Sequence, residues 1–448
     1  MKEVKMKEIY IIIMLVWLFP ACSNNHIANG GDIYNNPAGE GDTTGTIKSE
    51  KVKILWLDAE ANFQLFSQKS NITTYLDLAK KTGFNTIVVD VRPVQGDVLY
   101  KSKFMPELTT INGYTVTRDW DYLQYFVTEA HNRSLKVVAD ATIFTAGLLH
   151  PREGMAFRSN EWDDKISVIY SSNGSLVSGK NNPSKTEATV FLNPVISQVQ
   201  DFALKYITEI VTNYDIDGFN LDYCRYSDFS TDFSEASRVA FSNYIGVDVT
   251  NFPASIFTYN ADKTRNPGKY YKQWWEFRSM TIHDFIAKVN KTMNSIKPKV
   301  KLYYWAASWF GNRYEVGQNW GSKTYTDFDS SWASANYHNT GFADELDVFL
   351  LGAYLNRIYG LSDNESIEYA IYNGKKIING ACTMYGTIAA NNHMDNTDSN
   401  SNIENAVYVC LRDTPGLMVF DIVQVIQYGL WDGIKRGIDK AEKEYNEN

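Results

Sequence analysis

The segment 214–226 holds the densest group of side chains that can do chemistry in this 448-residue chain. It reads Tyr-Asp-Ile-Asp-Gly-Phe-Asn-Leu-Asp-Tyr-Cys-Arg-Tyr. Side chains alternate between the two faces of a β-strand, so Asn220 and Asp222 share one face and their apolar neighbours share the other. Asp222 ends the strand, and Arg225 is placed to orient its carboxylate or to keep it ionised. We expect Asp222 to be a catalytic carboxylate; the alternative is an Asp that caps the loop or forms a structural ion pair.

A second carboxylate is needed if the chemistry is glycoside hydrolysis, in which one group is the acid and the other is the base or nucleophile. Asp58, with Glu60 close by, follows the first apolar run of the body, and Asp421 follows the last. Both are candidates for this catalytic role, and structural pairing with Arg or Lys is the alternative for each. Asp90 is a further candidate that can instead pair with Arg92. The side chains expected to hold a sugar lie at strand ends and in the loops that follow: Asp90, Arg92, Asp140, Asn220, Arg225, Tyr226, Tyr304, Trp305 and Trp309.

Other chemistries lack their characteristic residues. The chain has six His and contains no His-Glu-x-x-His or Cys-x-x-Cys, so we predict no metal site. It has no Gly-x-Ser-x-Gly elbow, phosphate loop or dinucleotide fingerprint, and we predict no cofactor. Residues 398–402 begin like a calcium loop but lack its Gly and its final Glu, so a polar loop that caps a helix is expected. A net charge of −9 argues against binding to nucleic acid.

Strand-like and helical segments alternate from residue 51 onward. The expected strands are 53–58, 85–92, 135–141, 217–222, 300–306, 346–352, 375–381 and 417–421. The expected helices are 71–82, 119–133, 195–214, 269–296, 364–372, 403–412 and a last one to about residue 445. Eight such units predict an α/β fold, a (β/α)8 TIM barrel. The excess residues lie in strand-to-helix loops, with a hairpin signal at 171–174, on the face where barrel enzymes place their active sites.

The N-terminus has the features of an export signal. A basic start is followed by the apolar run 9–19, which is too short to span a bilayer. The sequence Leu-Phe-Pro-Ala-Cys that ends at Cys22 resembles a bacterial lipoprotein signal, so we expect lipidation of Cys22; ordinary cleavage near Ala21 is the alternative. The expected organisation is a signal (1–22), a flexible tether (23–50) and a single barrel (51–448). The protein would be lipid-anchored to the cell envelope and would touch the membrane only through that anchor.

Several segments resemble the glycosyl-hydrolase-like family ten, a set of bacterial, often lipid-anchored barrel proteins. The matching segments are 85–93 with Asp97 and Tyr100, 192–194, 213–226, 274–278 and 296–298. The resemblance covers about residues 52–440. It implies a barrel fold and glycosidase activity, which in some members is directed at peptidoglycan glycan strands. It transfers site roles best to Asp222, Arg92 and Asn193.

The sequence departs from that family at two places. Tyr223 stands where members commonly carry a second Asp, and the loop after the fifth strand differs. The motif that ends at Asp222 is also similar to the chitinase-type family eighteen pattern, but Cys224 stands at the position of its acidic Glu, and Asn220 replaces an Asp. A thiol cannot replace that acid, so substrate-assisted chemistry of this type is disfavoured.

The composition, with 44% hydrophobic and 14% aromatic residues, is typical of a globular protein. Aromatic rings offer flat apolar faces to sugars, and the platforms expected in the loops are Trp162, Tyr226, Trp309 and Trp320. The leading hypothesis is an exported glycoside hydrolase acting on a polysaccharide or cell-wall glycan. The rival hypothesis is a non-catalytic glycan-binding lipoprotein on a degenerate barrel, which Tyr223 favours; an interaction scaffold is a third. The sequence leaves the oligomeric state open.

Overall fold

The computed structural model describes residues 50–111, 113–184, 187–394 and 399–447. These residues belong to one compact unit that begins at Glu50. The expected signal, including Cys22, and residues 23–49 of the expected tether lie outside the described residues. None of the described helices is long and apolar enough to cross a membrane.

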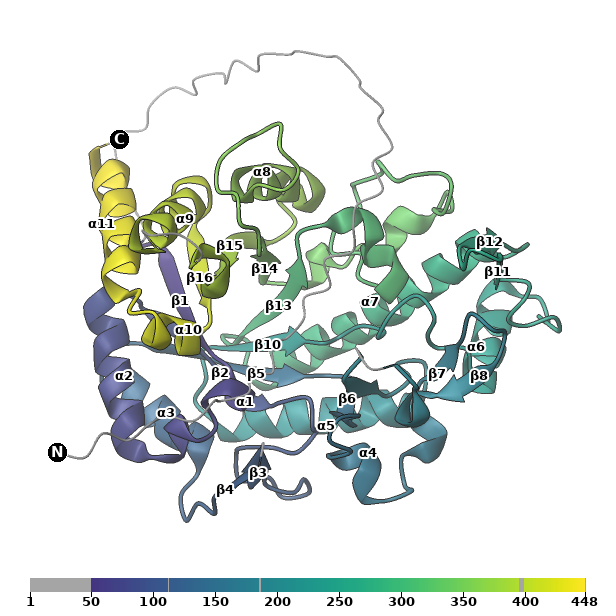
Figure 1. Ribbon diagram of the computed structural model, residues 1–448, viewed down its shortest axis with the longest axis horizontal. Coiled ribbons are helices and arrows are strands. Elements are labelled where there is room, and N and C mark those ends of the chain that lie inside the picture. Colours follow the sequence, from purple (N-terminus) through teal and green to yellow (C-terminus); the bar gives the residue numbers. More distant parts are fainter. Residues whose placement is uncertain (1–49, 112, 185–186, 395–398, 448) are drawn as a thin grey trace. The chain divides into compact units, whose positions relative to one another are not determined.

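Eight parallel strands close into a barrel (Figure 1). They are β1 (Val52–Leu57), β2 (Thr86–Arg92), β5 (Lys136–Thr142), β10 (Gly218–Asp222), β13 (Lys301–Ala307), β14 (Val348–Gly352), β15 (Thr383–Ala389) and β16 (Gly416–Phe420). Their order around the ring follows the chain, and the first strand pairs with the last. The prediction of a (β/α)8 TIM barrel is confirmed.

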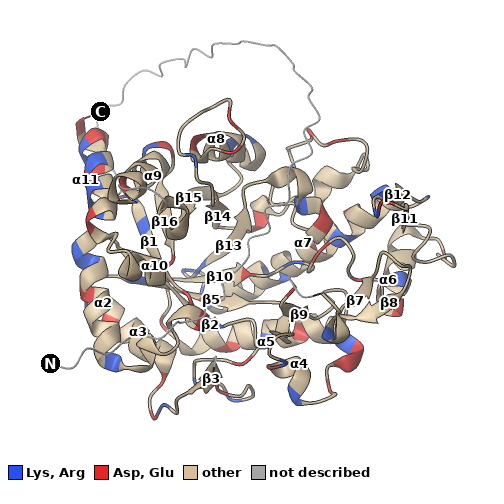
Figure 2. Cartoon of the chain, viewed as in Figure 1, with Lys and Arg blue, Asp and Glu red and all other residues tan. Residues whose placement is uncertain are grey.

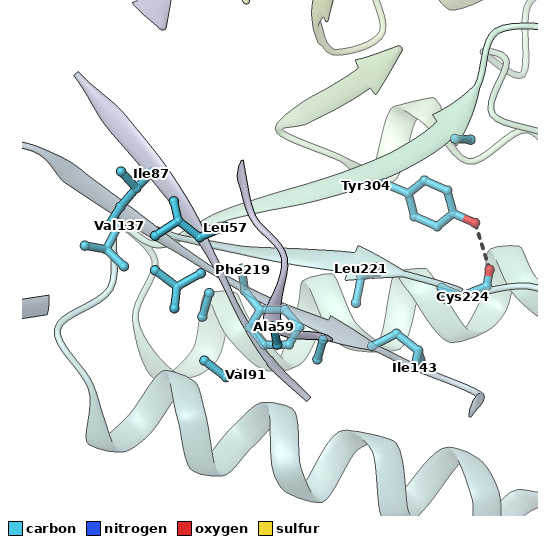
Figure 3. Packing of buried hydrophobic residues seen from close by; sticks show 14 of the residues in the cluster. Leu57, Ala59, Ile87, Val91, Val137, Ile143, Phe219, Leu221, Cys224 and Tyr304 are labelled. Carbon is cyan, nitrogen blue, oxygen red and sulfur yellow. Dashed lines mark hydrogen bonds between the residues drawn. The ribbon is translucent and has the colours of Figure 1, made fainter. Parts of the chain in front are cut away.

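Alternation of side chains gives the barrel two packed faces. The inward residues form one buried cluster: Ile54, Trp56, Val88, Val138, Tyr303, Val348, Leu350, Tyr385 and Met418. The outward residues of the same strands, such as Leu57, Ile87 and Phe219, pack in the cluster shared with the helices (Figure 3). This division matches the prediction that Asn220 and its apolar neighbours lie on opposite faces of the strand, because Phe219 and Leu221 pack in the cluster shared with the helices.

Helices cover the barrel from outside (Figure 1). They are α2 (Lys69–Thr82), α3 (Tyr122–His131), α5 (Ser197–Asn213), α7 (Tyr271–Ile296), α8 (Ile367–Ile378), α9 (Ser399–Asp413), α10 (Ile422–Gln427) and α11 (Trp431–Glu447). On α2 and α11, charged residues of both signs lie on the exposed sides (Figure 2). The connection 308–347, which is described throughout, contains three short 3-10 helices and no α-helix.

One predicted strand is wrong. The segment 375–381 was expected to be the seventh strand, but most of it belongs to the end of α8, and the strand β15 begins at Thr383. The run Lys-Lys-Ile-Ile that ends at Ile378 has the composition of a short strand. In the structure its isoleucines continue the buried stripe of the amphipathic helix α8. Asn379, with a φ of 47°, ends that helix in the left-handed conformation.

Long loops after the early strands build a second, smaller hydrophobic cluster. After β5 come β6 (Thr145–Leu148), α4 (Met155–Arg158), the hairpin β7 (Val168–Tyr170) and β8 (Leu176–Ser178), and β9 (Thr189–Phe191). After β10 come α6 (Glu235–Ile245), β11 (Phe257–Tyr259) and β12 (Arg265–Pro267). The predicted hairpin at 171–174 is confirmed by β7 and β8. Shorter additions are α1 (Ala59–Asn62) after β1 and the hairpin of β3 (Thr110–Ile111) and β4 (Tyr114–Thr115) after β2.

Candidate active site

Acidic side chains gather where β1, β2, β5 and β10 end, on the inward face of the barrel. Asp90 is the register partner of Asp140, and Asp140 is the register partner of Asn220. The Asn220 side chain donates a hydrogen bond from Nδ2 to Oδ1 of Asp140, at 2.7 Å. Asp58 follows β1, and Asp222 is the last residue of β10. The structure therefore brings together five of the residues that the sequence predicts for the site.

Burial and mutual repulsion keep the two central carboxyl groups close to their neutral forms. Burial, followed by the charges of Asp58 and Glu60, raises the pKa of Asp90 well above its usual value. Burial and the charges of Asp222 and Asp90 do the same to the pKa of Asp140, against the effect of the Asn220 hydrogen bond. Like charges in neighbouring buried positions cannot both ionise cheaply. The neutral forms of Asp90 and Asp140 are therefore favoured next to the less buried Asp222.

Asp222, the carboxylate that ends β10, is half-buried and thus more exposed than Asp90 and Asp140. Burial raises its pKa to about 6, although the Tyr223 amide and the Arg225 charge both favour the ionised form. The amide of Tyr223 donates to Oδ1 of Asp222 at 2.7 Å. Tyr223 has a φ of 48°, a left-handed conformation that costs a side chain other than Gly roughly 1–2 kcal/mol. Strain of this kind is concentrated at functional sites, and here it accompanies the amide contact to Asp222.

The two predicted partners of Asp222 act as helix caps in the structure. The Asp58 carboxylate accepts a hydrogen bond from the amide of Ala61 at 2.7 Å, at the start of α1. Asp421 accepts one from the amide of Val423 and caps α10. Burial raises the pKa of both residues, and their exposed fractions are 8% and 2%. The structure thus gives both a structural task and little contact with solvent.

Glu60 was not among the candidates, yet the structure places it at the barrel mouth. It lies on α1, is half-buried, and its Oε1 atom has no hydrogen-bond partner among the described residues. Burial, and then the charge of Asp58, raises its pKa to about 8. Its charge also acts on Asp90 and Tyr223. The sequence signal was its position two residues beyond Asp58; burial, which sets its protonation, could not be inferred from that position.

A row of aromatic rings also lies near the carboxyl groups of the mouth. Trp305 lies 5.3 Å from Tyr354, Tyr354 stacks on Phe420 at 5.7 Å, and Phe420 meets Trp56 at 5.9 Å, all between ring centroids. Burial and the nearby charge of Asp222 raise the pKa of Tyr354 well above its usual value. Of these four rings only Trp305 was predicted to hold a sugar. Carboxylates and aromatic rings close to one another suit a sugar, which offers hydroxyls on its edge and apolar faces.

Two predicted sugar ligands point away from the mouth. Tyr304 lies on the outward face of β13, where its hydroxyl donates to the Cys224 carbonyl at 2.7 Å (Figure 3). Arg92 follows a break in the register between β2 and β5 and is fully buried. Its guanidinium donates to the Thr145 carbonyl at 3.0 Å and lies 4.8 Å from the ring of Tyr206. Both side chains stabilise the loops that follow the strands: Tyr304 binds the loop after β10, and Arg92 binds the segment after β5.

Other predicted residues lie in the loops. Asn193 is fully buried and donates to Asp232 at 2.8 Å. Tyr226 is buried against the Arg278 guanidinium, 4.3 Å away. Trp320 is buried, whereas Trp162 and Trp309 are half-buried, and Arg225 is half-buried near Asp222. The described part of the chain shows no group of three or more His, Cys, Asp and Glu arranged to hold a metal ion.

A closed parallel barrel with carboxylates and aromatic rings at the carboxyl ends of its strands has the architecture of the barrel glycoside hydrolases. The chain belongs to the family described as Glycosyl hydrolase-like 10, whose model matches residues 51–385. It is 30% identical over 417 residues to an S-layer-related protein of Niallia circulans, covering 88% of this chain and 24% of that protein. It is 25% identical over 269 residues to the glycosyl hydrolase DigH of Escherichia coli (strain K12), covering 59% of this chain and 54% of that protein. The chain thus matches between a quarter and about half of these relatives' lengths.

Solved structures agree on the fold. The glycoside hydrolase domain of PgaB (BpsB) from Bordetella bronchiseptica superposes with a TM-score of 0.59 at 11% identity, over 87% of this chain and 99% of that one. Alpha-L-fucosidase isoenzyme 2 from Paenibacillus thiaminolyticus gives a TM-score of 0.53 at 12% identity, over 88% and 49%. At these identities the similarity establishes the barrel architecture and leaves the chemistry to the residues of the mouth.

Proposed function

We propose that this protein hydrolyses glycosidic bonds in a polysaccharide or cell-wall glycan by a two-carboxylate mechanism. The observation that supports this most directly is the pair of pKa values at the mouth, about 6 for Asp222 and about 8 for Glu60. At neutral pH, Asp222 is mostly ionised and acts as nucleophile or base. Glu60 is mostly protonated and acts as the acid. Two carboxyl groups held in different protonation states by their surroundings are the requirement of this chemistry.

The test is release of reducing ends from a panel of polysaccharides that includes peptidoglycan glycan strands with and without their stem peptides. We expect Asp222→Asn and Glu60→Gln each to lower kcat by a factor of about 10² to 10⁴. The matched control is Asp215→Asn, because Asp215 is a carboxylate with a side chain 91% exposed and precedes β10. Asp58→Asn and Asp421→Asn test the two acids predicted from the sequence. If Glu60 is the acid, each should lower kcat less than Glu60→Gln does.

The pH profile gives an independent readout. We expect a bell-shaped dependence of kcat/KM with limbs near pH 6 and pH 8, the upper limb being absent in Glu60→Gln. Full hydrolysis by Asp222→Asn would remove Asp222 from the mechanism. Binding without turnover across the whole panel would favour the non-catalytic glycan-binding lipoprotein, the alternative that Tyr223 supports.

We also propose that the protein is exported and lipid-anchored through Cys22. The basic start and the apolar run 9–19 support this location. A labelled fatty acid should be incorporated into the full chain and not into Cys22→Ser, and the variant should separate from the membrane fraction. Equal labelling of the two chains would contradict the anchor.

A further inference from the structure

Arg225 lies near Asp222, and a second arginine, Arg313, lies close enough to Arg225 for their charges to interact. Arg225 is in the loop directly after β10, and Arg313 is in the first 3-10 helix after β13, the neighbouring strand. Neither forms an ion pair with any residue in the described ranges; Glu315, whose charge reaches Arg313, is paired with Arg265. A guanidinium group that is partly removed from water gains from an acidic partner, and a fully buried one is almost always paired. Two unpaired guanidinium groups at one place therefore need an explanation.

Their hydrogen bonds leave most of the donor atoms available. Arg225 donates from Nη1 to the carbonyls of Tyr226 and Ser227, at 2.9 and 2.8 Å. Arg313 donates from Nε to Asn312 at 3.0 Å. The remaining guanidinium nitrogens of both arginines form no hydrogen bond with the described residues. None of these nitrogens is fully buried. They are thus open to a solvent-borne acceptor.

The two cations also act on each other. Burial and the charge of Arg225 lower the pKa of Arg313 to about 10, so it stays charged at neutral pH in an unfavourable setting. The charge of Arg225 also reaches Asp222 and the ring of Tyr304, which places Arg225 close to the proposed catalytic carboxylate, with Arg313 next to Arg225. A bound anion would neutralise both guanidinium groups and offset their repulsion.

Aromatic rings next to the two arginines offer a surface for a sugar residue. Arg313 lies 5.7 Å from the centroid of Trp309, which is half-buried. The guanidinium group of Arg225 lies over the ring of Tyr223, 5.0 Å from its centroid, which holds the plane of the guanidinium in place. An aromatic face beside planar guanidinium forks fits an acidic sugar, because the ring packs on the indole while the acid group takes paired hydrogen bonds.

We propose that Arg225 and Arg313 form a subsite for an anionic group, a carboxylate or a sulfate, on a sugar residue of the glycan next to the bond that is cut. This rests on the proposed function, since it assumes that a glycan occupies the mouth beside Asp222. The subsite makes the preferred substrate an acidic polysaccharide. A whole chain with a net charge of −9 would otherwise repel such a substrate, so a local cationic site is what binding requires.

The test measures binding, without turnover, by isothermal titration of the full chain carrying Asp222→Asn. The probes are oligosaccharides of polygalacturonate, of chondroitin sulfate and of peptidoglycan strands freed of stem peptides, each with its carboxyl-reduced or desulfated counterpart. We expect at least one acidic probe to bind about tenfold or more tightly than its neutral counterpart. The carboxyl-reduced and desulfated arms show which acid group is recognised.

Arg313→Gln is the decisive variant because, among the residues that the structure describes, Arg313 makes only one side-chain hydrogen bond, to its neighbour Asn312. It should weaken the acidic probe by about tenfold and leave the neutral counterpart unchanged. The control Arg436→Gln changes an arginine of α11 that pairs with Glu404 on the exposed surface, and it should alter neither affinity. Equal binding of acidic and neutral probes, no binding of any acidic probe, or an equal effect of Arg313→Gln on both would each overturn the subsite. Hydrolysis of neutral glycans by the unaltered protein would still support the proposed function, so the two failures are distinguishable.

Discussion

Six carboxyl groups share the barrel mouth, and the pKa of every one of them is raised. They are Asp58, Glu60, Asp90, Asp140, Asp222 and Asp421. An acid whose pKa is higher in the folded than in the unfolded protein lowers stability as the pH rises above its unfolded value. Such a concentration of acids lowers the stability of the fold at neutral pH, and folding alone does not require it. Proteins retain costs of this kind where function needs the groups.

Asp140→Asn should reveal that cost directly. Asn keeps an oxygen that can accept the hydrogen bond from Asn220 and removes the buried acid. In the wild type, Asp140 ionises near pH 4 when unfolded and at much higher pH when folded, so folding loses up to about 1.4 kcal/mol per pH unit above pH 4. The free energy of unfolding is measured in urea at pH 5 and pH 8. The gain in this free energy from wild type to Asp140→Asn should be larger at pH 8. The control Asp201→Asn changes an exposed carboxylate of α5 and should show the same small difference at both pH values. A pH-independent effect of Asp140→Asn would contradict the predicted cost of the buried acid.

Residue type and strand position could be predicted, and exact orientation could not. The strand-end rule found Asp58, Asp90, Asp140 and Asp222, because parallel strands of a barrel deliver their last residues to one face. The direction of a side chain was predicted wrongly where the sequence does not show which residues of a strand face inward, as in the continuous apolar run of β13. Tyr304 follows the inward Tyr303 by one residue and so points outward. The inward role of Tyr354 arises from the path of the loop after β14, for which the sequence carries no periodic signal.

At the scale of elements, the loops after β5 and β10 fold together into a unit with its own core. Phe233 contacts four rings contributed by three segments: Tyr170, Phe252, Phe257 and Trp274. Figure 1 shows β7, β8, α6, β11 and β12 grouped at one side, away from α2 and α11. This cluster is separate from the core between barrel and helices. Its members are far apart in sequence, so only the locations of the insertions could be predicted, and not their joint core.

Phe233→Ala should loosen this unit while the barrel stays folded. Removing a buried Phe costs about 3–5 kcal/mol, and here the lost contacts all lie in the smaller cluster. Limited proteolysis read by mass spectrometry should show new cleavage within 226–268, and hydrogen exchange should rise there and not in β15 or β16. Phe126→Ala is the comparison, since Phe126 is on the buried face of α3, in the core between barrel and helices. If both variants unfold the whole chain at the same urea concentration, the cluster is not an independent unit.

At the scale of the whole molecule, the two ends of the described chain close the barrel. β1 pairs with β16, and α11 packs against α9. Lys53, on the first strand, has a side chain only 3% exposed and forms ion pairs with Glu442 of α11 and with Glu50, the latter at 3.0 Å. A buried cation is tolerated only when it is paired, so the last helix provides the charge that the first strand needs.

Glu442→Gln should therefore lower stability more than its exposed position suggests. The change leaves the buried Lys53 ammonium with Glu50 alone, and the expected loss is about 1–3 kcal/mol in the free energy of unfolding. Glu447→Gln, on the same helix and 3.9 Å from Lys443, should change the free energy of unfolding by less than about 0.5 kcal/mol. Lys53→Met should also cost little, because it removes the buried charge instead of its partner. Urea midpoints that rank Lys53→Met below Glu442→Gln would mean that the packing of the Lys53 stem, rather than its charge pair, ties the last helix to the first strand.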